Sequence, residues 1–242
     1  MDFFRRRFLQ QSFAVAAAPA TGLAATTPAP GPHLTLLGDS TLANGAYTRG
    51  KPDVLAHMQK ILPSYWTASL LAQNGATIET IPDQLARLPP YATHLLLSVG
   101  GNNALARQGL LDEPASSTAG AIIKLADAVD KFEVQYRQLI AACLKPGMPL
   151  TLCTIYNAHF ADASRRRPVR AAVALFDDAI IRVATQHKLK VIDLRLVCAR
   201  PEDYANQIEP SSVGGAKIAR TIVAVITEPA DGHGALVLGP AA

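Results

Sequence analysis

The segment His33-Leu-Thr-Leu-Leu-Gly-Asp-Ser-Thr41 joins a short apolar run to a polar turn. The run has the length of one β-strand, and a nearly continuous apolar strand is typical of a sheet that is covered on both faces. Gly38 lets the chain bend sharply where this strand ends. The segment therefore indicates an α/β domain in which polar residues follow the carboxyl ends of the strands.

Short apolar runs alternate with longer stretches of helical periodicity along the rest of the chain. The strands are expected near residues 33–37, 66–71, 94–99, 149–154 and 190–193. The helices are expected near residues 52–62, 78–88, 120–144, 168–187 and 211–227. This alternation predicts a three-layer α/β/α, flavodoxin-like fold with a five-stranded parallel sheet.

The composition is that of a globular protein with a sizeable core, because 49% of the 242 residues are hydrophobic and 17% are charged. Nothing between residues 33 and 227 looks like a linker, so residues 31–228 are predicted to form one domain. Residues 229–242, rich in Gly, Pro and Ala, are expected to be a loosely attached tail. A net charge of +4 is too small to indicate a nucleic-acid partner, and basic and aromatic residues are not interleaved.

Residues 1–30 have the features of a targeting segment followed by a spacer. Arg5-Arg6-Arg7-Phe8-Leu9 resembles the twin-arginine export motif, although Phe4 stands where Ser or Thr is usual. An apolar run and small residues up to Ala24 follow, and the run is too short to remain as a membrane anchor. The pattern favours a periplasmic or secreted protein, and the alternative is a cytoplasmic protein with a disordered or amphipathic leader.

Cys143, Cys153 and Cys198 all lie in apolar contexts. Their odd number and the lack of C-x-x-C spacing argue against a disulfide framework and against a zinc site. We expect them to behave as small buried hydrophobic residues.

Ligands of open α/β sheets bind beyond the carboxyl ends of the strands, so chemistry is expected in the loops that follow them. Ser40 follows the first strand, within Gly-Asp-Ser-Thr, a sequence that is also an ordinary helix-capping turn. The spacing of the next blocks makes it more informative. Asn-Gly75-Ala-Thr follows the second strand, and Gly-Gly-Asn102-Asn103 follows the third.

These blocks, in this order, resemble the SGNH/GDSL hydrolases, and the resemblance extends over residues 33–225. It implies that Ser40 attacks an acyl carbonyl. It also implies that the oxyanion is stabilised by the backbone N–H groups of Ser40 and Gly75 and by the side-chain amide of Asn102. Such donors are effective because negative charge develops on this oxygen in the tetrahedral intermediate. The alternative for Gly75 and Asn102 is a role in the turns alone.

The last block of the family departs from its usual pattern in this chain. The family has Asp-x-x-His before a proline, whereas this chain has Asn206-Gln-Ile-Glu209-Pro210. Glu209 thus takes the position of the base and Asn206 that of the orienting residue, and Asn103 replaces another usual Asp. A second carboxylate beside a Glu base repels it, so a neutral Asn that donates to the carboxylate is compatible with a Ser40–Glu209 dyad. Burial that raises the pKa of Glu209 makes it a better base.

Other residues on the ligand side are candidates for substrate contact. Asp39 and Asn103 flank the predicted oxyanion donors, and His159 is the one histidine in a loop beyond a strand. His159 is also the alternative base. Arg165-Arg166-Arg167 has two interpretations, a solvated approach to a helix or a clamp for an anionic substrate.

Taken together, these features predict an esterase or lipase-like acyl hydrolase that acts on a small-molecule ester or an acylated glycan, without a metal or cofactor. A carbohydrate O-deacetylase or acyl transferase is an alternative that uses the same Ser40 chemistry. A further alternative is a non-catalytic acyl- or glycan-binding relative that lost the histidine base.

Overall fold

The computed structural model describes residues 31–227 and 237–238. The predicted leader and most of the predicted tail lie outside the described residues. None of the helices within the described residues is long and apolar enough to cross a membrane.

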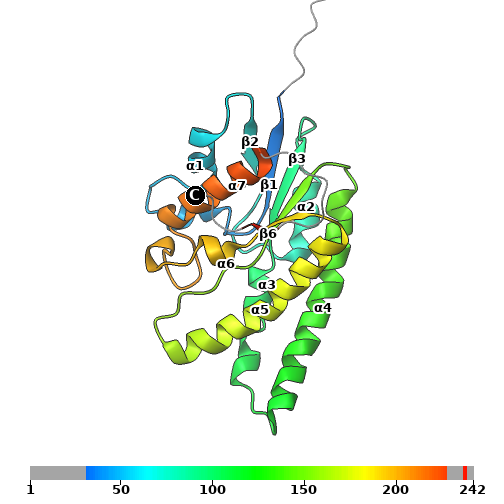
Figure 1. Cartoon of the computed structure of the whole chain (residues 1–242), viewed down its shortest axis with the longest axis vertical. Coiled ribbons are helices and arrows are strands. Elements are labelled where there is room, and N and C mark those ends of the chain that lie inside the picture. Colours follow the sequence, from blue (N-terminus) through cyan, green and yellow to red (C-terminus); the bar gives the residue numbers. More distant parts are fainter. Residues whose placement is uncertain (1–30, 228–236, 239–242) are drawn as a thin grey trace, which may run out of the picture. The chain divides into compact units, whose positions relative to one another are not determined.

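One parallel sheet forms the centre of the domain (Figure 1). Its strands are β1 (His33–Gly38), β2 (Thr67–Leu70), β3 (His94–Ser98), β4 (Leu150–Cys153), β5 (Lys190–Ile192) and β6 (Val237–Leu238). The order is β2-β1-β3-β4-β5-β6, and every neighbouring pair is parallel. The flavodoxin-like α/β/α fold is therefore confirmed. All five predicted strands are present, and the two-residue β6 pairs with β5 and adds a sixth strand at this edge of the sheet.

Helices pack on both faces of the sheet. The bounds of the α-helices are α1 (Val54–Ile61), α2 (Ile81–Leu85), α3 (Gly101–Leu105), α4 (Thr118–Leu144), α5 (Ala163–Gln186), α6 (Leu194–Val197) and α7 (Ser212–Thr227). The shorter 3-10 helices are η1 (Asn44–Tyr47), η2 (Ile78–Thr80), η3 (Gln108–Asp112) and η4 (Pro201–Asp203). One core contains residues of α1, α6 and α7, and the other contains residues of α2, α4 and α5.

The strands divide their apolar side chains between these two cores because successive strand residues point to opposite faces. Leu34 and Leu36 of β1 pack with α1 and α7, whereas Leu37 packs with α4 and α5. All three side chains are fully buried. The continuous apolar run thus reflects burial on both faces, as the sequence indicated.

Helix α5 begins five residues earlier than the sequence suggested. Pro168 is therefore not at the start of the helix but is its sixth residue, where the missing N–H costs one backbone hydrogen bond. The cap lies at Asp162, whose carboxylate accepts from the Ser164 N–H at 2.8 Å. The arginine run 165–167 therefore lies inside the first turns of α5 rather than before the helix.

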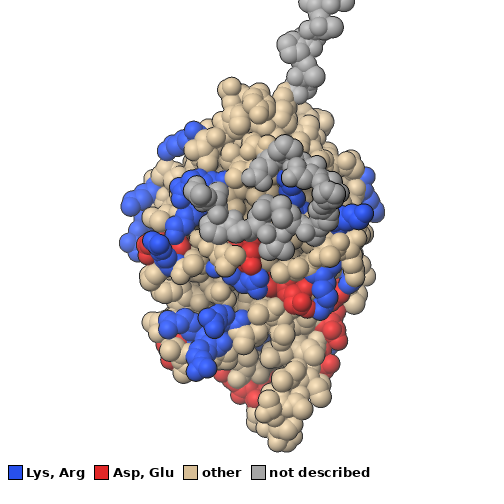
Figure 2. Space-filling model, viewed as in Figure 1, with Lys and Arg blue, Asp and Glu red and all other residues tan. Residues whose placement is uncertain are grey.

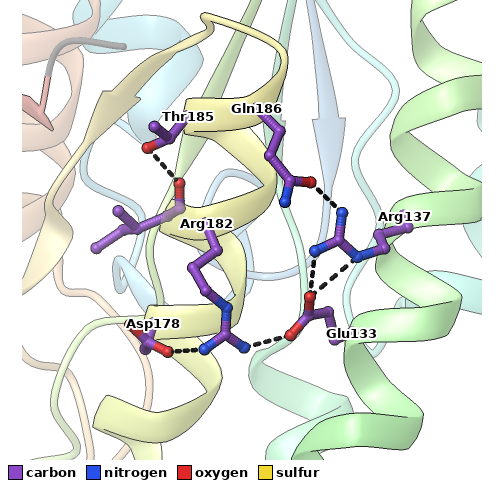
Figure 3. A network of polar contacts seen from close by, with 7 residues as sticks. Glu133, Arg137, Asp178, Arg182, Thr185 and Gln186 are labelled. Carbon is purple, nitrogen blue, oxygen red and sulfur yellow. Dashed lines mark hydrogen bonds and ion pairs between the residues drawn. The ribbon is translucent and has the colours of Figure 1, made fainter.

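Helices α4 and α5 lie side by side and are joined by a polar network (Figure 3). Arg182 of α5 forms ion pairs with Glu133 of α4 and with Asp178 of its own helix. Arg137 of α4 contacts Glu133 and Gln186. Exposed ion pairs contribute little each, so the apolar contacts beneath them hold the two helices together.

The three cysteines are buried and unpaired, as the sequence suggested. Burial raises the pKa of Cys143 to about 12 and that of Cys198 to about 12. Burial also raises the pKa of Cys153. All three are therefore protonated and poorly reactive at neutral pH.

Candidate active site

The turn after β1 presents Ser40 at the carboxyl end of the sheet. Gly38 has φ +136°, and a Cβ at this position lies 1.9 Å from the Ser98 carbonyl oxygen, so only glycine fits. Asp39 stabilises the turn because its Oδ1 accepts from the Thr41 N–H at 2.9 Å. Ser40 is 7% exposed, and it borders a cavity.

Gln84 of α2 forms hydrogen bonds to this turn, a role that was not identified from the sequence. Its Oε1 accepts from the Gly38 N–H at 2.8 Å, and its Nε2 donates to the Gly38 carbonyl at 2.8 Å. The side chain is almost fully buried. A polar residue among the apolar positions of a predicted helix is the signal that points to such a role.

Ser40 and Glu209 are 169 positions apart in the chain and meet in the site. The Ser40 hydroxyl donates to Glu209 Oε1 at 3.2 Å. Glu209 is 7% exposed, and its other oxygen, Oε2, has no hydrogen-bond partner among the described residues. A buried acceptor in this state is costly, so the arrangement requires strong support from the surrounding loop.

Several side chains provide that support for Glu209. Asn206 Oδ1 accepts from the backbone N–H groups of Ile208 and Glu209, both at 2.9 Å. The buried Asn44 donates to the Pro210 carbonyl at 3.3 Å, and Tyr156 donates to the Ile208 carbonyl.

The role expected for Asn206 needs a correction. The sequence suggested a donor to the carboxylate, but the side-chain oxygen of Asn206 instead accepts from the backbone of the loop. An Asn before a turn forms such local bonds readily, and here the bonds to the loop backbone form in place of a bond to the Glu209 carboxylate. Asn206 therefore positions Glu209 through the main chain.

The site holds two carboxyl groups with raised pKa values. Burial raises the pKa of Glu209, and the hydrogen bond from the Ser40 hydroxyl opposes this effect. The pKa of Asp39 is raised to about 6, because burial and the charge of Glu209 raise it more than the hydrogen bonds donated by Thr41 lower it. A raised pKa brings Glu209 closer to the range of a useful base at neutral pH.

The predicted oxyanion donors lie in the loops after β1, β2 and β3. Asn102 Nδ2 donates one hydrogen to the Ala76 carbonyl at 2.8 Å, which links two of these loops and fixes the direction of the amide. Gly75 has φ +77°, and a Cβ added at this position would have no other atom within 4 Å. Gly75 is thus required by its left-handed backbone, rather than by close approach of another atom.

Asn103 is not placed to contact a substrate in the cavity. Its Oδ1 accepts from the Ile78 N–H and its Nδ2 donates to Glu79 Oε2, both at 3.1 Å. Both ends of the amide are used to join α3 to η2, and Asn103 is not among the residues that line the cavity. This expectation is corrected. Asp39, in contrast, does line the cavity.

The cavity beside Ser40 has a volume of about 110 Å³ and is mostly apolar. Ser40, Glu209 and Asn102 are among the residues that line it. Apolar side chains of α3, η3, α4, α5 and the loop after β4 form its walls, among them Leu105, Leu111, Leu125, Ile155, Phe160, Val169, Val173 and Phe176.

His159 lies apart from Ser40, in a neighbouring groove. Its ring stacks on Tyr204 with centroids 5.2 Å apart, and its backbone N–H donates to the Gln207 carbonyl at 2.7 Å. Glu209, not His159, accepts the hydrogen bond of Ser40. The geometry therefore favours Glu209 over His159 as the partner of Ser40.

Solved structures share this fold. An extracellular lipase from Streptomyces rimosus superposes with a TM-score of 0.61 at 15% identity, over 81% of this chain and 100% of that one. A phospholipase A1 from Streptomyces albidoflavus gives 0.60 at 13% identity, over 82% and 100%. The acetylxylan esterase Axe2 from Geobacillus stearothermophilus gives 0.56 at 16% identity, over 83% and 97%. The class of fold is thus that of these α/β lipases and esterases.

The sequence itself gives the family. Residues 36–214 match the model of the GDSL-like Lipase/Acylhydrolase family, so this chain belongs to that family. Membership confirms the predicted resemblance and makes the protein an ester-bond hydrolase. No curated protein matches the chain in a sequence search.

Proposed function

We propose that this protein is a serine esterase in which Ser40 is the nucleophile and Glu209 is its general base. The observation that carries the proposal is the 3.2 Å hydrogen bond from the Ser40 hydroxyl to a nearly buried carboxylate. A nucleophile within hydrogen-bond reach of a base is the arrangement required for acyl transfer.

In the first step, Ser40 Oγ bonds to the acyl carbon while its proton passes to Glu209 Oε1. The tetrahedral intermediate then collapses, the bond to the alcohol oxygen breaks, and Glu209 returns the proton to that oxygen. Water attacks the acyl-enzyme by the same route and gives up its proton to Glu209. The acid product leaves, and Ser40 regains its hydrogen.

The negative charge of each intermediate falls on the former carbonyl oxygen. The backbone N–H groups of Ser40 and Gly75 and the second amide hydrogen of Asn102 are the proposed donors to it. The hydrogen bond from Asn102 to the Ala76 carbonyl supports this role, because it holds the amide in place before the charge develops.

Glu209 takes the place of histidine through its environment. Burial raises its pKa, so the carboxylate is more basic than an exposed one. The neutral side chain of Asn206 shapes the loop without adding a second negative charge. This combination supports a working dyad rather than a site that lost its base.

The apolar cavity suits the acyl half of the substrate. It adjoins Ser40 and Asn102, and its walls offer hydrocarbon contacts but few polar partners. A small-molecule ester or an acylated glycan is the proposed substrate class. The fold shared with an acetylxylan esterase supports the glycan as the second candidate, with deacetylation or acyl transfer as its reaction.

Hydrolysis of p-nitrophenyl acetate and butyrate tests this proposal. Ser40→Ala is expected to abolish turnover and to leave the melting temperature nearly unchanged. Ser116→Ala, which alters an exposed serine, is the matched control and should retain full activity. Turnover by Ser40→Ala that equals the wild-type rate would remove Ser40 from the mechanism.

A further inference from the structure

A second groove, here called the α5 groove, lies beside the active-site cavity. It is lined by Asn157, Ala158, His159, Arg166, Arg167, Arg170, Cys198, Ala199 and Tyr204, and has a volume of about 390 Å³. Three arginines and no Asp or Glu line it. Basic side chains gather over the N-terminal end of α5 in Figure 2.

The arginines of the α5 groove stand where they destabilise the helix. Arg166 and Arg170 are four positions apart and Arg167 is three before Arg170, so all three share a face, and like charges at these spacings repel. The helix dipole also disfavours cations in the first turns, where α5 has no acidic residue other than its cap Asp162, whose carboxylate accepts from Ser164.

Two arginines at the start of α5, Arg165 and Arg166, are held by contacts within the protein. Arg165 pairs with Asp112 at 2.7 Å, and Arg166 donates to the Phe160 carbonyl at 2.9 Å. Arg167 and Arg170 have neither an ion pair nor a side-chain hydrogen bond within residues 31–227. Their guanidinium groups are therefore available to a ligand.

The α5 groove adjoins the loop that carries Glu209, the proposed base. Ala158 lines both the groove and the cavity, and the His159 N–H donates to the Gln207 carbonyl, two residues before Glu209. Tyr204 of the groove donates to the Asn157 carbonyl at 2.7 Å and so ties the groove wall to the loop after β4.

The proposed chemistry sets how the substrate lies between the active-site cavity and the α5 groove. Glu209 must return a proton to the alcohol oxygen, so the alcohol half leaves on the Glu209 side, while the apolar cavity receives the acyl half. The alcohol half thus extends toward the α5 groove.

We propose that the α5 groove binds an anionic group, a carboxylate or a phosphate, on the alcohol half of the ester. Arg167 and Arg170 supply forked N–H donors, which match both oxyanions. The inference rests on the proposed function for the direction of the substrate, and it narrows the substrate class to esters of anionic alcohols.

Matched acetate esters test this preference. The probes are para-acetoxybenzoate and para-acetoxyphenyl phosphate, which are anionic, and para-acetoxybenzamide, which is neutral. In the double variant Arg167→Gln/Arg170→Gln, kcat/KM for an anionic ester should fall about tenfold, the equivalent of about 1.4 kcal/mol. Turnover of the neutral ester should be unchanged. A fall for the benzoate alone identifies a carboxylate ligand, and a fall for the phosphate alone identifies a phosphate ligand.

Arg220→Gln is the control, because it removes one positive charge from an exposed position on α7. It should change neither class of ester. Equal losses for anionic and neutral esters in the double variant, or no loss for either, would overturn the inference.

Binding separates this inference from the proposed function. In the Ser40→Ala background, calorimetric titration with para-hydroxybenzoate and with inorganic phosphate should show binding that the two arginine substitutions remove. The neutral para-hydroxybenzamide should bind equally with and without them. If the wild type hydrolyses none of the esters, the proposed function fails but this titration still decides the inference: arginine-dependent anion binding supports it, and absence of anion binding refutes it.

Discussion

Glu209→Gln changes a charge in the active site while keeping nearly the same shape. Gln retains an oxygen that can accept the Ser40 hydroxyl, whose donor–acceptor distance to Oε1 is 3.2 Å in the wild type. The variant therefore keeps Ser40 in place but cannot take up its proton. Because a positioned base contributes about 10²- to 10⁴-fold, kcat/KM should fall by about that factor.

The assay is the pH dependence of kcat/KM with p-nitrophenyl butyrate. Glu209 acts in its ionised form and burial raises its pKa, so wild-type activity should decline on acidification at a higher pH than the titration of an exposed Glu would give. This acid limb should be absent from the residual activity of Glu209→Gln. Glu202→Gln, at an exposed carboxylate in η4, is the matched control and should behave as the wild type.

Stability provides an independent readout with a defined sign. A carboxyl group with a raised pKa in the folded state binds its proton more tightly folded than unfolded, so it costs stability as pH rises above its unfolded pKa. Glu209→Gln removes this cost. The difference in melting temperature, Glu209→Gln minus wild type, should therefore be more positive at about pH 8 than at about pH 4, because the pKa of an unfolded Glu lies close to the lower of these values.

Retention of wild-type kcat/KM and of the acid limb by Glu209→Gln would refute Glu209 as the base and direct attention to His159.

Three other outcomes follow from the geometry, and a fourth follows from the sequence of residues 1–30. Asn102→Ala should lower kcat by about 10²- to 10³-fold with little change in KM, measured by steady-state kinetics, because an oxyanion donor acts mainly in the transition state; a change in KM alone would contradict this role. Asn206→Ala should lower kcat/KM more than Asn206→Asp does, because Asp keeps the oxygen that accepts from the loop backbone; the reverse order would contradict a positioning role. With a series of p-nitrophenyl esters, kcat/KM should rise about fourfold per methylene from acetate to butyrate, since each buried CH₂ contributes about 0.8 kcal/mol, and Val173→Phe, which fills the cavity, should flatten this rise; a chain-length dependence that is identical in the variant would argue against the cavity as the acyl site. We also propose that residues 1–30 direct export, so N-terminal sequencing after expression in a host with a twin-arginine pathway should find a mature terminus near Ala25, and intact protein in the cytosol would contradict it.

The fold was predictable because the strands that build it carry a strong local signal. Leu34, Leu36 and Leu37 are apolar on both faces of β1, a pattern that marks a covered parallel sheet wherever it occurs. The short strand β6 gives no such signal, because two residues are too few to show a period. Its pairing with β5 depends on the tertiary structure.

The positions of Ser40 and Glu209 were also predictable, because residues after parallel strands gather at one edge of the sheet and the family blocks fix their order. The side chains that hold Ser40 and Glu209 in place were not predictable. Gln84 and Asn44 act through bonds to backbone groups that are distant in the chain, and no local pattern indicates which backbone group a buried amide will meet. Asn206 shows the same limit, since its side chain has both donor and acceptor atoms and the loop geometry determines which is used.

The most direct test of the central claim is covalent labelling with a fluorophosphonate, followed by mass spectrometry of the intact protein and its peptides. The proposed dyad predicts one phosphonyl group per chain, located on Ser40, with no labelling of Ser40→Ala and strongly slowed labelling of Glu209→Gln. Absence of modification in the wild type, or modification at another residue that persists in Ser40→Ala, would contradict the claim that Ser40 is an activated nucleophile.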